Sequence, residues 1–174
     1  QLEHVHLARL FARMGHTTAA EREANIVPCA SARMLCQIDC LMTASQLACQ
    51  ANQLEQAAAC LPQIVDLLKR GIQCGAIIDP WNILGFDAHY SLFPALENSV
   101  RDHRADELVE LMDRLWAVYS RVWSEAAAVD HGDVAKKVAR QFKETAAWWN
   151  KYAVHEVSSV EAVDSLVVYR AAEG

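Results

Sequence analysis

Apolar residues recur at α-helical spacing on both sides of one stretch that lacks this spacing. The clearest run lies in the second half of the chain, where one seam comprises Leu108, Met112, Leu115, Tyr119, Val122 and Ala126. Residues so spaced share one face of a helix. Hydrophobic residues make up 53% of the 174, which is enough for a sizeable core. The sequence therefore predicts an all-α fold, a helical bundle of roughly five to seven helices.

Residues 29–52 form the most apolar of the predicted helices. A seam with alternating spacings of four and three residues comprises Met34, Ile38, Leu41, Ser45 and Ala48. Because this helix is apolar on nearly all sides, we expect it at the centre, surrounded by the others. Its many alanines, serines and cysteines would let neighbouring helices approach closely.

Two helices are predicted before the central one. Residues 2–14 form a short amphipathic helix, and Gly15 ends it. Thr17 or Thr18 is expected to cap the next helix, with Glu21 in the position that completes a capping box.

A further helix is predicted over residues 53–70. Pro62 lies within it and is expected to kink or restart it, because proline lacks the N–H that a helix interior needs. Lys69 and Arg70 fall in the last turn and Gly71 just beyond it, as helix C-termini prefer. The helix that carries the seam first described is expected to begin at Asn98 or Ser99.

The C-terminal part of the chain is predicted to hold two more segments. A helix capped by Asp133 is expected to bury Ala135, Ala139, Phe142, Ala146 and Trp149. A last segment over residues 154–172 is predicted as helix, although residues 166–169 could equally form a strand.

The stretch from residue 71 to residue 99 interrupts the helical pattern with glycines, prolines and aromatic residues. A connection this long inside a compact domain is unusual and tends to be functional or disordered. Its low charge and high aromatic content argue against disorder. We therefore predict a long, ordered loop, with Asp79-Pro80 as the start of a helical turn. It would form either a structural plug at one end of the bundle, which we favour, or a site for a ligand or partner.

The candidate binding residues lie in this loop and in the helix start that follows it. They combine aromatic, amide, acidic and basic groups: Asp79, Trp81, Asn82, His89, Tyr90, Glu97, Arg101, Asp102, His103 and Asp106. If the loop closes a pocket, the acids and histidines among them would converge there.

The acidic residues of this helix start are one possible metal site. Asp102, Asp106 and Glu110 line one helical stripe and could hold a divalent cation. Such a site needs a second acidic cluster on a facing helix, which the sequence does not provide, so a solvated helix start is the better interpretation. Glu3 and His6 match half of a di-iron motif without the other half. We predict no metal and no cofactor.

Six cysteines stand at positions 29, 36, 40, 49, 60 and 74. Five of them fall in predicted helices, where neighbours on one face cannot easily form a disulfide. Only Cys36 and Cys40 have a spacing typical of zinc ligands, and one pair is not enough. We expect buried thiols that pack as small hydrophobic groups, as in a reducing, cytoplasmic compartment.

The composition argues against two classes of partner. The net charge is −6, and no basic surface typical of nucleic-acid binding is evident. A basic stripe of Lys136, Arg140, Lys143 and Lys151 is best read as a solvated face, or else as a dock for an acidic partner. No uncharged apolar run is long enough for a membrane span.

Two functions remain open from the sequence. The first, which we favour, is a non-catalytic helical interaction or scaffold domain that uses the 71–99 loop as its contact surface. Its partner would be another protein or the remainder of a larger chain, of which residues 1–174 would be a single helical domain. The second is an enzyme or a ligand- or metal-binding domain whose pocket this loop closes.

Overall fold

The computed structural model describes residues 2–74, 94–129 and 131–156, with side chains for 2–74, 108–129 and 131–150. Within these ranges the chain is helical and contains no strand, which confirms the predicted all-α bundle. The helices are α1 (Leu2–Arg13), α2 (Thr17–Ile26), α3 (Ala30–Gln50), α4 (Leu54–Gln73), α6 (Pro94–Ala128) and α7 (Gly132–Glu156).

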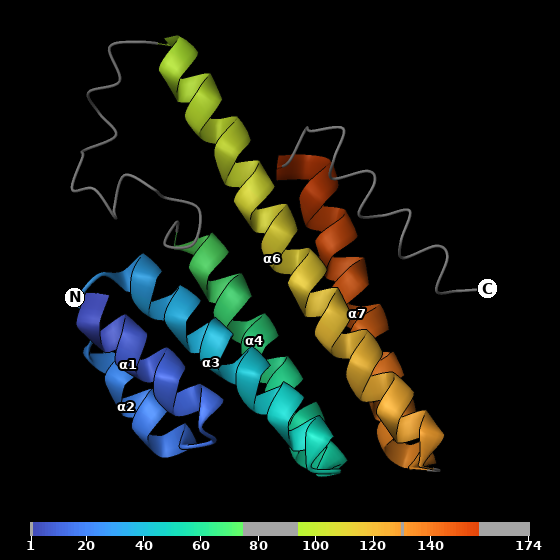
Figure 1. Ribbon diagram of the computed structural model, residues 1–174. Helices are drawn as coiled ribbons and strands as arrows, with labels where there is room; N and C mark the ends of the chain where they lie inside the picture. Colours follow the sequence, from blue (N-terminus) through green and yellow to red (C-terminus); the bar gives the residue numbers. More distant parts are fainter. Residues whose placement is uncertain (1, 75–93, 130, 157–174) are drawn as a thin grey trace.

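The helices form consecutive antiparallel pairs that lie side by side (Figure 1). The pairs are α1 with α2, α3 with α4, and α6 with α7. Between pairs, α3 packs against both α1 and α6, while α4 packs against α6 and α7. Since α3 also contacts α2 and α4, it is enclosed by four neighbours, and its predicted central position is confirmed.

Two of the tight turns between paired helices have the same backbone construction. Gly15 after α1 has φ +78° and Asn52 after α3 has φ +56°, the left-handed conformation that glycine and asparagine tolerate best. The amide of Gln53 bonds to the Ala48 carbonyl at 2.8 Å, and that of Asn52 to the Cys49 carbonyl at 3.0 Å. This is a Schellman motif, which satisfies the last carbonyls of α3 while the chain reverses into α4.

The principal core lies among α3, α4, α6 and α7. Every member of the predicted α6 seam is at most 2% exposed. Side chains from the facing helices complete the core, among them Ile38 of α3, Leu61 and Ile64 of α4, and Trp149 of α7. One buried polar bond joins α3 to α4, because Ser45 Oγ donates to the Ala57 carbonyl at 3.0 Å.

The buried face of α7 differs from the predicted one. Val134 and Val138 are 3% and 1% exposed, whereas Ala135 and Ala139 are only partly buried. Thr145 is buried as well, and its Oγ1 lies 3.0 Å from the Tyr119 hydroxyl of α6. The face toward the core is thus turned by about one residue at its start, and a hydrogen-bonded threonine occupies a core position farther along.

Several predicted helix ends are wrong. Helix α4 continues to Gln73, with Gly71 buried inside it, and the Cys74 amide still bonds to the Arg70 carbonyl at 3.0 Å. Pro62 lies within α4 without ending it. Helix α6 begins at Pro94 rather than at Asn98 or Ser99, and proline suits a first helical position because its missing N–H would have no helical partner there.

The predicted cap of α2 is also wrong. Thr17 is its first helical residue, and the N-cap is His16, whose side chain makes no capping hydrogen bond. None of the described helices combines the length and the apolar composition that a membrane span requires.

Asp39 of α3 links the first helix pair to the third. One carboxylate oxygen lies 2.6 Å from Arg9 Nη2 of α1, and the other lies 2.6 Å from Arg114 Nη2 of α6. The Asp39 side chain is 17% exposed, and the two arginines are 44% and 49% exposed. This half-buried bridge joins segments that are far apart in sequence.

Candidate functional site

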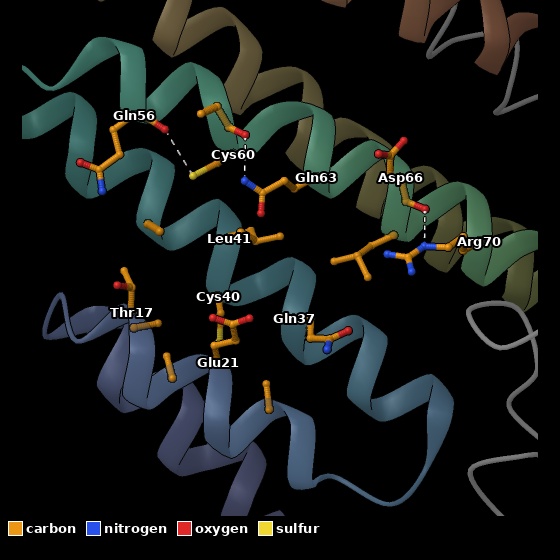
Figure 2. A pocket seen from close by; sticks show the side chains of 16 residues that line it. Thr17, Glu21, Gln37, Cys40, Leu41, Gln56, Cys60, Gln63, Asp66 and Arg70 are labelled. Atoms are coloured by element: carbon orange, nitrogen blue, oxygen red, sulfur yellow. Dashed lines mark hydrogen bonds between the residues drawn. The ribbon is translucent and has the colours of Figure 1, made fainter.

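A groove lies between α2 and α4, with α3 as its floor (Figure 2). Both α2 and α4 pack on α3. The groove has a volume of about 510 Å³, within the range of small-molecule sites. Its lining combines charged, amide, thiol and small apolar side chains.

The α4 wall is built by residues spaced alternately three and four positions apart: Gln56, Ala59, Gln63, Asp66 and Arg70. This spacing puts them on one face, opposite the apolar face that α4 buries in the core. Gln63 Nε2 donates to the Ala59 carbonyl at 3.1 Å, and Arg70 Nε donates to the Asp66 carbonyl at 3.3 Å. Both long side chains are therefore held along the helix, and Figure 2 shows the Gln63 amide oxygen turned toward the groove.

The α2 wall and the floor are made mostly of small residues. Ala20 and Ala24 of α2 and Ala44 of α3 line the groove, with Glu21 and Thr17 adding polar groups. The floor also includes Gln37, Cys40 and Leu41. Gln37 Nε2 donates to Asn25 Oδ1 at 2.7 Å, which fixes α2 against α3. Small side chains on the floor allow a ligand's backbone to approach α3 closely.

Two thiols, Cys40 and Cys60, line the groove. A hydrogen bond with Cys36 raises the pKa of Cys40 far above its usual range, and burial raises it further. Burial raises the pKa of Cys60 too. Both side chains are therefore neutral thiols at physiological pH, and weak nucleophiles.

Cys36 lies one turn before Cys40 and packs against Ala8 and Ala24. The hydrogen bond from Cys40 lowers the pKa of Cys36, against the effect of burial. None of the six cysteines, all in the described part of the chain, forms a disulfide. The predicted packing role is confirmed for Cys36, Cys49 and Cys60, which are buried, while Cys74 is exposed.

None of the described residues that line the groove is a predicted site residue. The predicted residues between 75 and 93 lie outside the described residues: Asp79, Trp81, Asn82, His89 and Tyr90. The others fall within the helical backbone of α6, with side chains outside the described set: Glu97, Arg101, Asp102, His103 and Asp106. Their convergence therefore stays a prediction. Among the described residues, no group of three or more potential ligands could hold a metal ion.

Sequence reasoning missed the groove, although part of its signal was visible. The polar positions of α4 follow the helical repeat as regularly as its apolar ones, with Gln56 and Gln63 seven residues apart. A polar stripe of this kind is ordinarily a solvated face. Only the packing of α2 and α4 on the same helix turns it into a wall.

Comparison with known proteins supplies no relative from which a role could be taken. No protein-family model, no curated protein and no solved structure matches the chain. The function is therefore argued from the groove itself.

Proposed function

We propose that the protein is a non-catalytic helical interaction domain that holds an extended segment of a partner polypeptide in the groove between α2 and α4. The observation that carries the proposal is the groove's lining, which combines amide side chains of α3 and α4 with small residues of α2 and α3. The part of the predicted 71–99 loop that lies between α4 and α6 remains a second, predicted contact surface of the same interaction domain.

The amides suit a polypeptide main chain. An extended segment presents one N–H donor and one carbonyl acceptor at each residue, and each glutamine side chain offers both a donor and an acceptor. Gln56 and Gln63 come from the α4 wall, and Gln37 comes from the α3 floor. A peptide backbone lying along the groove could exchange hydrogen bonds with the α4 wall and with the floor.

The charges of the lining favour a neutral or basic segment. Glu21 and Asp66 are acidic and Arg70 is basic, so the groove has one net negative charge. The whole chain carries −6. A strongly acidic segment would be repelled, because its carboxylates would lie close to those of Glu21 and Asp66.

The chemistry of the thiols favours binding over catalysis. A cysteine nucleophile is active as the thiolate, and enzymes lower its pKa for that reason. In this groove the pKa values of Cys40 and Cys60 are raised. Both thiols serve better as small apolar groups of the lining.

The test is to fill the groove from a position that does not disturb the core. Ala59 is exposed on α4 and lines the groove, so Ala59→Trp should obstruct it without unfolding the protein. The probe is a set of linear twelve-residue peptides selected on the wild-type protein from a random phage-displayed library. Fluorescence anisotropy then compares their affinities for wild type and variant.

We expect Ala59→Trp to weaken binding about 100-fold or more, because a few buried contacts carry most of the energy of such interfaces. Ala117→Trp is the matched control, since Ala117 is exposed on α6, away from the groove. Failure to select any peptide would contradict the proposal. Equal affinity of selected peptides for both variants would do so as well.

A further inference from the structure

Helix α3 carries two cysteines one turn apart, Cys36 and Cys40, on the face that packs toward α1 and α2. Cys36 is fully buried beside Ala8 and Ala24, and Cys40 packs against the same cluster. The two thiols also form a hydrogen bond with each other. The pair is therefore in direct contact within largely apolar surroundings.

The spacing of the pair suits a metal ion better than a disulfide. Residues four apart on a helix have Cβ atoms about 5–6 Å apart, whereas the Cβ atoms of a disulfide lie about 3.5–4.5 Å apart. Two metal–thiolate bonds of about 2.3 Å each, the length found in zinc sites, span about 4.6 Å between the sulfurs when they lie in line. Side chains one helical turn apart can reach this separation without a change in the backbone.

The number of ligands selects the ion. Zinc takes four ligands in structural sites, and one pair was too few for the zinc site considered from the sequence. Within the part of the chain whose side chains are described, no third potential ligand joins the pair to make a group that could hold a metal ion. Copper(I) is a soft ion with a filled d shell that prefers thiolates and can be held by two of them in line. One pair is therefore enough for copper(I).

We propose that Cys36 and Cys40 form a two-coordinate site for copper(I) that the ion enters from the groove. Cys40 lines the groove, and Figure 2 shows it on the side of the α3 floor that faces α2. The ion replaces both thiol protons, which pass to the solvent, and forms two copper–sulfur bonds with no change in oxidation state. The proposal goes beyond the peptide-binding role and does not rest on it.

The surroundings of the pair favour the reduced ion. Alanines rather than nitrogen or oxygen donors pack around Cys36, whereas copper(II) prefers nitrogen and oxygen ligands in a square plane. Two thiolates with one copper(I) ion carry one net negative charge. The ion pair of Arg9 with Asp39 lies beside both thiols, so the fixed charges nearest to the site sum to zero and do not repel this product.

Competition with the copper(I) chelator bicinchoninate tests the site, in ascorbate and without oxygen. The full chain with Cys74→Ala is the reference protein, because Cys74 is an exposed thiol that could bind copper by itself. We expect this protein to bind a single copper(I) ion, with two sulfur ligands in X-ray absorption. Cys36→Ala and Cys40→Ala, each added to the reference, should weaken binding about 100-fold or more, because one thiolate loses the advantage of two linked donors.

Cys60→Ala is the matched control. Cys60 is a buried thiol of the same groove, but Gln56 and Ile64 stand one turn from it in place of a second cysteine. Its removal should leave copper(I) binding unchanged, and all three variants should keep their helical circular dichroism, since a buried thiol packs as a small apolar group. A reference protein that binds copper(I) no more tightly than Cys36→Ala would overturn the proposal. A loss in Cys60→Ala as large as that in Cys40→Ala would overturn it as well.

Discussion

At the scale of single residues, the thiols show what a sequence can and cannot settle. Their helical spacing predicted packing rather than disulfide formation, and Cys36, Cys49 and Cys60 are buried. The exposure of Cys74 depends on where α4 ends, and that end was predicted three residues too early. The hydrogen bond between Cys36 and Cys40 could not be predicted, because it depends on side-chain conformations set by α1 and α2.

The buried thiol of Cys60 should make stability depend on pH. Burial raises its pKa in the folded state, so the folded protein holds this proton more tightly than the unfolded chain. Its contribution is fully present below the thiol pKa of the unfolded chain and is lost as pH rises toward the folded value. Urea unfolding of wild type and Cys60→Ala at pH values between about 7 and 10 should show a smaller loss of stability with pH in the variant.

Cys74→Ala provides the control for this measurement. Cys74 lies at the end of the same helix and is exposed, so its removal should leave the slope of stability with pH unchanged. Identical slopes for wild type and Cys60→Ala would show that the thiol titrates alike in the folded and unfolded states.

At the scale of helices, the regular apolar seams were predictable and their exact orientation was not. The α6 seam was predicted completely, because its six apolar residues alternate regularly between spacings of four and three and no polar residue interrupts the seam. On α7, alanines on several faces gave the pattern little contrast. Thr145 was not among the predicted core residues because its side chain is polar. It is buried in the structure, where its hydroxyl is paired with that of Tyr119.

The orientation of α7 can be tested with one pair of variants. Val138 is 1% exposed and Ala139 is only partly buried. Val138→Asp should lower the free energy of unfolding by about 3 kcal/mol or more, because it buries a charge without a partner. Ala139→Asp should cost about 1 kcal/mol or less. Urea denaturation followed by circular dichroism measures both, and the reverse order of costs would support the orientation predicted from the sequence.

At the scale of the whole molecule, the arrangement of the pairs creates the features that the sequence did not reveal. The groove exists because α2 and α4 lie on the same helix with space between them. The Asp39 bridge exists because α1 and α6 both lie against α3. Spacing within one helix carries no information on either feature, since both depend on which helices become neighbours.

The bridge should make a modest contribution to stability that salt reduces. Asp39→Asn removes the charge that two arginines share, and it should lower the free energy of unfolding by about 1 kcal/mol, a value kept small because both arginines are half exposed. The difference from wild type should shrink in about 1 M sodium chloride, where charges are screened over about 3 Å. Urea unfolding at low and high salt measures both effects.

Glu144→Gln is the control for the bridge. Glu144 forms an exposed pair with Arg140 at 4.0 Å within α7, and its loss should cost less than about 0.5 kcal/mol. A cost for Asp39→Asn no larger than this, or one that salt leaves unchanged, would show that the bridge adds little.

The enclosure of α3 by four helices also has a consequence for how the chain folds. The turn between α3 and α4 is short, so their contacts close a small loop and are gained early at little entropic cost. Four of the described helices, α1, α2, α4 and α6, pack directly on α3. We therefore expect the α3–α4 pair to act as the folding nucleus, with the α1–α2 and α6–α7 pairs docking onto it from opposite sides.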